Sequence, residues 1–104
     1  MAHHVLAVMS AAKDGRDAEY DQWYESTHMA EMLAIPGIVA GRRLVASPLS
    51  PGAPPARYLT EFDIDADDPR SVLAEMARRS QSGEMSMTDA VDPGQVHIWI
   101  FERR

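Results

Sequence analysis

The stretch from Asp17 to Gly37 most constrains the fold, because its pattern predicts one amphipathic helix with a defined end. At about 100° per residue, one face of this helix collects aromatic, small and polar side chains. Pro36 and Gly37 end the helix, since proline disfavours helical conformation at the residue before it and glycine accepts positive φ. The predicted inward face consists of Tyr20, Trp23, Tyr24, Thr27, Ala30, Glu31 and Ala34, with His28 at its edge.

Four short segments have the apolar or alternating pattern of strands, at residues 4–9, 38–46, 57–64 and 95–101. A second helix is predicted from Asp67-Asp-Pro69 to about Arg79, burying Val72, Leu73 and Met76. The four prolines of residues 47–55 predict an exposed hairpin connection. Residues 80–92 show no sustained period, so we expect a mobile segment that holds at most a short helical turn.

The order β-α-β-β-α-β predicts an α+β, ferredoxin-like fold, with a four-stranded antiparallel sheet and both helices on one of its faces. The 104 residues, 1–104, fit a single domain. The last strand is apolar on both faces, with Val96, Ile98 and Ile100 on one and His97, Trp99 and Phe101 on the other. The sheet face without helices therefore needs a cover, and a second copy of the chain is the simplest one. We expect a homodimer whose two sheets enclose a barrel-like interior.

The composition limits the classes of partner that the protein is expected to bind. Ten Lys and Arg stand against 16 Asp and Glu, for a net charge of −6, and no basic run is interleaved with aromatic residues. Nucleic acid and anionic membrane surfaces are therefore not expected as partners. The chain has no cysteine, no secretion-type leader and no apolar run near the roughly 20 residues that span a bilayer. The expected location is cytoplasmic.

The inward helix face carries the main candidates for chemistry. His28 is the first candidate for a catalytic acid or base, because imidazole titrates near neutral pH. Tyr24, one turn earlier, could orient His28 or donate a hydrogen bond to a developing oxyanion. Trp23 is expected to anchor the helix on the sheet and, with Thr27, to border the substrate. For each of them, simple packing in the core is the alternative.

Further candidates lie on Glu31 and on the strands. Glu31 is expected to pair with Arg42 or Arg43, and the alternative is a carboxylate whose pKa an apolar cavity raises. Strand alternation sends one arginine toward the helices and the other away from them, where an arginine in a cavity would suit a substrate carboxylate or enolate. His97 shares a strand face with Trp99, and both border either the substrate or, as the favoured interpretation for His97, the dimer interface.

No cofactor or metal is expected. The four histidines, His3, His4, His28 and His97, have no HExxH or other close ligand spacing. The chain also lacks a glycine-rich phosphate loop, a dinucleotide fingerprint and a Gly-x-Ser-x-Gly elbow. These absences argue against nucleotide cofactors and serine-hydrolase chemistry.

One group of motifs resembles a known family. The chain contains Asp21-x-Trp23-Tyr24-x-x-x-His28, then Leu33-Ala-Ile-Pro-Gly37 and the Arg42-Arg43 pair. This series of motifs is similar to the signature of the dimeric α+β barrel superfamily, closest to its EthD-like branch. The resemblance implies a homodimer with a shared barrel, a small-molecule cavity and a cavity-facing histidine at the position of His28. Relatives in this superfamily include cofactor-free monooxygenases, cyclases, dehydratases, decarboxylases, an isomerase and haem-handling proteins, and the fold does not choose among them.

The predicted function is a cofactor-independent enzyme acting on a small apolar, aromatic or polyketide-like molecule. His28 would move a proton, while Tyr24 and one of the two arginines would stabilise the enolate, which suits a lyase, dehydratase, decarboxylase or isomerase. A cofactor-free monooxygenase is one alternative, and a non-catalytic protein that binds a hydrophobic metabolite is another. The environment of His28 distinguishes an enzyme from a binding protein, because a catalytic imidazole must face an open cavity.

Overall fold

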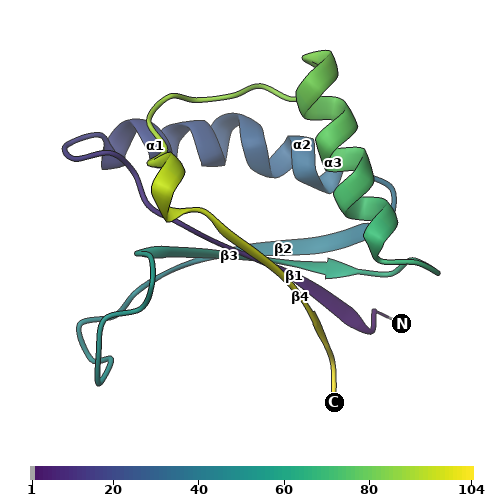
Figure 1. Ribbon diagram of the computed structural model, residues 1–104, viewed down its shortest axis with the longest axis horizontal. Helices are drawn as coiled ribbons and strands as arrows, with labels where there is room; N and C mark the ends of the chain where they lie inside the picture. Colours follow the sequence, from purple (N-terminus) through teal and green to yellow (C-terminus); the bar gives the residue numbers. More distant parts are fainter. Residues whose placement is uncertain (1) are drawn as a thin grey trace.

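The computed structural model describes residues 2–104 as two layers, a sheet and a set of helices on one of its faces (Figure 1). The sheet is antiparallel, with strand order β2-β3-β1-β4. Its strands are β1 (His4–Ser10), β2 (Ile38–Val45), β3 (Tyr58–Ile64) and β4 (His97–Glu102). This arrangement confirms the predicted α+β, ferredoxin-like fold.

The first helix contains a π turn in its middle. It begins as α1 (Asp17–Trp23), continues as the π-helical η1 (Tyr24–His28) and ends as α2 (Met29–Leu33). Hydrogen bonds from residue i to i+5 place more residues in a turn than an α-helix does, so the inward face moves along the sequence. The prediction that Ala30 and Ala34 lie on this face is wrong, because both are exposed. After the π turn, Met32 and Ile35 are buried instead, each with 1% exposure.

The helix ends where the sequence predicts. After α2, Gly37 adopts a φ of 99°, a conformation that side chains with a Cβ rarely accept. A Cβ at this position would also lie 3.2 Å from the Cβ of Ala66. Glycine is therefore required here both by backbone conformation and by space.

Gly41 leaves room on β2 for the ring of Phe62 and for the end of the Met29 side chain. A Cβ at Gly41 would lie 2.8 Å from the ring of Phe62 and 3.1 Å from the terminal methyl of Met29. A larger residue at this position would have to displace one of these side chains. The register shift of β2 lies between Ile38 and Ala40.

The second helix, α3 (Arg70–Ser82), buries Val72 completely and ends at Gly83 with a φ of 81°. Residues 84–92, named the strap from here on, then run back above the first helix to the 3-10 turn η2 (Pro93–Gln95) that precedes β4 (Figure 1). Met85 and Ala90 of the strap are buried, with 4% and 0% exposure. The expected mobility of this segment stays a prediction.

The core lies between the helices and the sheet and has two parts. One is aliphatic, around Leu6, Met32 and Phe62, and the other is aromatic, around Tyr20 and Tyr24. Residues from both parts line a cavity, which therefore lies where the two parts meet. Over residues 2–104, none of the helices has both the length and the apolar character needed to cross a bilayer.

Candidate functional site

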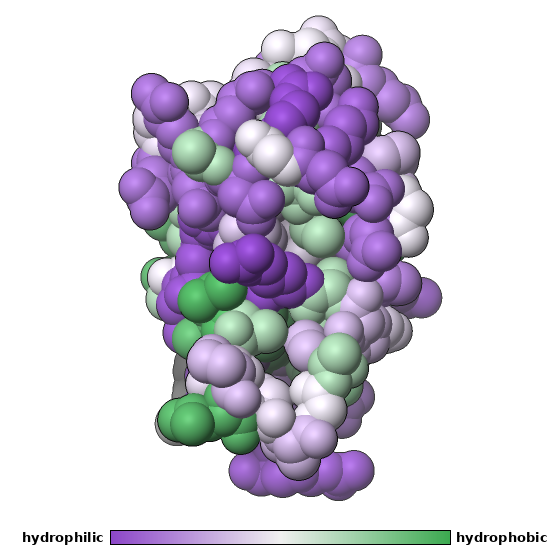
Figure 2. Space-filling view, turned by 90° about the vertical axis from the view of Figure 1, so that its left-hand side faces the viewer, coloured by the Kyte–Doolittle hydropathy of each residue, from purple (hydrophilic) through white to green (hydrophobic). Residues whose placement is uncertain are grey.

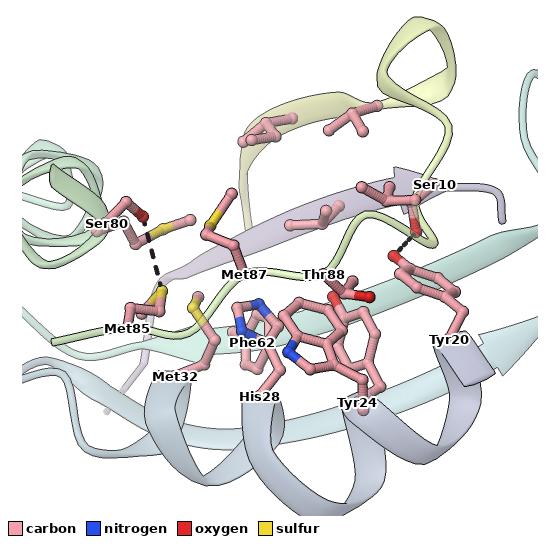
Figure 3. Close-up of a pocket in the computed structure, with 16 residues that line it drawn as sticks. Ser10, Tyr20, Tyr24, His28, Met32, Phe62, Ser80, Met85, Met87 and Thr88 are labelled. Atoms are coloured by element: carbon pink, nitrogen blue, oxygen red, sulfur yellow. Dashed lines mark hydrogen bonds between the residues drawn. The ribbon is translucent and has the colours of Figure 1, made fainter. Parts of the chain in front are cut away.

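The cavity between the first helix, α3, the strap and the sheet is the candidate functional site (Figure 3). Its volume is about 200 Å³, and most of its lining is aliphatic, aromatic or methionine side chain. The lining residues that carry a polar atom are Ser10, Tyr20, Trp23, Tyr24, His28, Ser80 and Thr88. The sequence-based candidates Trp23, Tyr24 and His28 are thus brought together around one cavity.

His28 is held between two aromatic rings. Its imidazole stacks on Trp23, with ring centroids 4.3 Å apart and planes 16° apart, and meets the edge of Tyr24 at 4.9 Å. The side chain is 15% exposed. Burial lowers the pKa of His28 below its ordinary value, and the nearby Glu31 carboxylate opposes this shift without cancelling it. The imidazole is therefore neutral near pH 7 and able to accept a proton.

The two ring nitrogens of His28 have different surroundings. Nδ1 is buried, makes no hydrogen bond and lies 3.5 Å from Oε1 of Glu31. Within residues 2–104, no protein group is hydrogen-bonded to Nε2. Glu31 accepts hydrogen bonds from the backbone N–H and the hydroxyl of Ser86, at 2.7 and 3.2 Å. Glu31 therefore connects the strap with the inner side of the imidazole.

The expected ion pair between Glu31 and an arginine is wrong. Both arginines are paired with other carboxylates, and the partner of Glu31, Ser86, belongs to the strap. The i, i+3 spacing of His28 and Glu31 was the available signal for their contact. The sequence analysis missed it because the favoured partner had the opposite formal charge.

Tyr24 and Tyr20 place phenols along the cavity. Tyr24 is 3% exposed, and burial raises the pKa of its hydroxyl to about 12, so it remains a hydrogen-bond donor at neutral pH. The Tyr20 hydroxyl is hydrogen-bonded to Oγ of Ser10 at 2.7 Å, and Figure 3 shows this pair at one end of the cavity. Burial also raises the pKa of Tyr20. Tyr20 and Ser10 are site residues that the sequence analysis did not propose.

Trp23 forms part of the cavity wall beneath the strap and packs against the aromatic part of the core, and its role as an anchor of the helix stays a prediction. Its indole N–H donates to Oγ of Ser86 at 3.3 Å, and its ring stacks on His28 and, at 5.9 Å, on Tyr20. Thr27 does not line the cavity, since the π turn brings His28 inward in its place. Contact of these two residues with a substrate stays a prediction.

The two adjacent arginines lie on opposite faces of the sheet. Arg43 faces the helices, donates to Asp21 at 2.9 Å and places its guanidinium 4.4 Å from the centre of the Tyr24 ring. Arg42 lies on the opposite face and binds Glu61 and Asp63, at 2.8 and 3.3 Å. The Arg42 hydrogen bond holds the pKa of Asp63 below its ordinary value. Neither arginine lines the cavity.

His97 and Trp99 also lie on the sheet face away from the helices. Their rings stack at 5.6 Å, and Trp99 is 42% exposed. In the register of the sheet, they lie opposite Met9 and Ala7 of β1. The sheet therefore separates both residues from the cavity. A place for His97 at a dimer interface stays a prediction.

Within residues 2–104, no three His, Asp or Glu side chains come close enough together to hold a metal ion.

The sequence analysis also missed the methionines of the cavity wall. They come from α2, α3 and the strap, and they are Met32, Met76, Met85 and Met87. The spacing Tyr20, Tyr24, His28 and Met32, four residues apart each time, was the signal that could have defined the cavity side of the first helix.

The fold and the cavity define the class: a ferredoxin-like α+β protein with a hollow between its sheet and its helices. Among solved structures, the chain is similar to the crystal structure of an ethyl tert-butyl ether d (EthD) family protein from Bacillus halodurans C-125. The similarity covers 100% of both chains, with a TM-score of 0.63 and 21% sequence identity. The chain therefore has an EthD-like fold. No protein-family model matches it, and neither does any curated protein.

Proposed function

We propose that the protein is a cofactor-independent enzyme that moves a proton on a small apolar substrate bearing a carbonyl or a phenolic hydroxyl. The observation that carries this proposal is the setting of His28 in the cavity wall. Its Nδ1 faces Glu31, while Nε2 has no protein partner within the described residues. The negative charge of Glu31, 3.5 Å from Nδ1, favours a proton on that nitrogen, which leaves the lone pair of Nε2 free to accept one from the substrate.

The neighbouring residues have defined parts in this step. The bound substrate gives a proton to Nε2 of His28, and the negative charge moves to its oxygen. The hydroxyl of Tyr24 stays protonated and can stabilise that oxygen by a hydrogen bond. Return of the proton from His28 to another carbon gives isomerisation, and its transfer to a β-hydroxyl, which then leaves as water, gives dehydration. The apolar cavity lowers the local dielectric, which strengthens these interactions.

The test is exchange of the α-protons of 1-tetralone, a neutral two-ring ketone, in deuterated buffer, followed by proton NMR. We expect the protein to accelerate exchange, and His28→Gln to reduce that acceleration about 10²- to 10⁴-fold. His3→Gln is the matched control, since His3 is exposed and does not line the cavity. Equal exchange by wild type and His28→Gln would reject the catalytic role. Binding of the ketone without exchange would favour a binding protein.

We also propose that two copies associate through the sheet face that carries no helices. Its central residues are Ala7, Met9, Leu59, Trp99 and Phe101. Figure 2 shows the molecule from one side, where strongly hydrophobic residues lie along the lower left edge among hydrophilic ones and the upper half is mainly hydrophilic. The charges of this face are already paired within the chain, through Arg42 with Glu61 and Asp63. An isologous contact between two such faces would bring apolar areas together without an excess of one charge.

A further inference from the structure

We infer that the cavity takes neutral molecules of one or two rings that carry a hydroxyl or carbonyl oxygen, and that it rejects carboxylates of the same size. This inference rests on the proposed function, because it assigns the substrate class of the same site. It is argued from the charge, the volume and the polarity of the cavity.

The charge of the lining excludes anions. Among the described residues that line the cavity, none is Lys, Arg, Asp or Glu. The guanidinium of Arg43, on β2, lies against the ring of Tyr24 and is paired with Asp21. His28 is turned toward Glu31, which brings a negative charge close to the cavity. A carboxylate would lose its hydration there without gaining a cationic partner, and this is strongly unfavourable.

The volume limits the number of rings. A dry protein cavity of about 150 Å³ holds benzene, and pockets for drug-sized ligands begin at about 300 Å³. The present cavity, at about 200 Å³, lies between these sizes. Its floor is fixed, because Met32 and Phe62 are 1% and 0% exposed. A third fused ring would have to displace packed side chains or leave its apolar surface in water at the mouth of the cavity.

The two ends of the cavity differ in polarity, as Figure 3 shows. Met32, Met85 and Met87 lie toward one end, and Ser10 and Tyr20 lie at the other. Thioether sulfur makes favourable contacts with aromatic rings. The hydroxyl pair at the opposite end can exchange hydrogen bonds with a neutral oxygen. This polarity favours a ring system with one oxygen substituent.

The rim of the cavity is exposed and apolar. Three of the lining residues are well exposed: Met87 at 72%, Ile98 at 46% and Val96 at 40%. They come from the strap and from the start of β4, so the mouth of the cavity lies between these two elements. The rim is apolar as well, and it offers no charged group that would guide an anion inside.

Three ligands test the inference by direct binding at pH 7. These are 1-naphthol, which is neutral with two rings, 1-naphthoate, which has the same rings and a carboxylate, and 1-hydroxyanthraquinone, which is neutral with three rings. Methyl-¹³C-methionine NMR reports binding at the cavity through Met32 and Met85. We expect 1-naphthol to shift these methyl signals and each of the other two ligands to bind at least about tenfold more weakly. Equal affinity of naphthoate and naphthol would overturn the inference, and so would equal or tighter binding of the three-ring ligand.

A pair of variants sharpens the test of charge. Val96→Lys places a cation at the rim, and Val39→Lys places one on β2, where Val39 is 59% exposed and does not line the cavity. We expect Val96→Lys to tighten the binding of 1-naphthoate at least about threefold. Val39→Lys should leave this affinity at the wild-type value. The same gain in both variants, or a gain in neither, would contradict the explanation by cavity charge.

The outcomes separate this inference from the proposed function. Selective binding of 1-naphthol without exchange of 1-tetralone protons would support the inference and reject catalysis. Exchange that depends on His28, together with tight binding of 1-naphthoate, would support catalysis and overturn the inference. Failure of all three ligands to shift the methionine signals would overturn the inference as well.

Discussion

The two faces of the sheet share the same strands but differ in how they are covered. On the helix-covered face, Leu6 and Phe62 are 0% exposed, and Phe62 lines the cavity. On the other face, called the open face, Trp99 and Phe101 remain 42% and 55% exposed. One chain thus completes a core on one face only. We therefore propose ligand chemistry for the covered face and association for the open face.

The largest effect is expected from truncating one aromatic ring on each face. Phe62→Ala should lower the free energy of unfolding by about 3–5 kcal/mol, because it removes a fully buried ring and leaves a cavity. Phe101→Ala should cost about 1 kcal/mol or less within a single chain, since its ring already contacts water. Urea denaturation at low protein concentration measures both, because association then contributes least. Similar losses of unfolding free energy in the two variants would contradict the difference in burial between the two faces.

The close packing of the covered face can be tested at a glycine. Gly41→Ala should cost about 1–3 kcal/mol, because the new methyl would lie 2.8 Å from the ring of Phe62. Gly52→Ala is the matched control, since a Cβ at Gly52 meets no atom within 4 Å. Urea denaturation of both variants gives the comparison. A neutral Gly41→Ala would mean that the ring of Phe62 can shift to make room for the new methyl.

The open face is tested by association. If two copies meet there, Phe101→Lys should raise the dissociation constant of the dimer at least about tenfold, because it places a charge in an apolar interface. Leu49→Lys is the control, since Leu49 is 92% exposed in the connection between β2 and β3. Light scattering over a range of concentrations measures both. A wild-type protein that stays monomeric at micromolar concentration would leave the open face without this partner.

The smallest effect concerns pH and the histidine of the covered face. Burial holds the pKa of His28 below the value of the unfolded chain, which is about 6.5. Between these two values the unfolded chain binds more protons, so stability rises with pH and is lost as the pH falls below about 6.5. His28→Gln should remove this part of the pH dependence. Urea denaturation of both proteins at several pH values checks it, and an unchanged slope would contradict the burial of a neutral imidazole.

The sequence-based predictions succeeded where the information was local. Alternation placed Arg42 and Arg43 on opposite faces, but their directions depended on the register in which Arg43 lies opposite Thr60. Helical periodicity placed Tyr24 on the inward face, but a uniform period could not show the π turn that brings His28 inward instead of Thr27. A π turn depends on the packing of both halves of the helix, which no local pattern encodes.

The sequence by itself determined the order of the elements, the end of the first helix at Pro36 and Gly37, and the presence of an imidazole near its inward face. Only the tertiary structure decided what surrounds that imidazole. Glu31 meets Ser86 across 55 residues of sequence, and the strap that carries Ser86 closes the cavity over Trp23. The physical reason is that propensity and periodicity act between near neighbours, whereas the surroundings of a side chain depend on where distant segments cross.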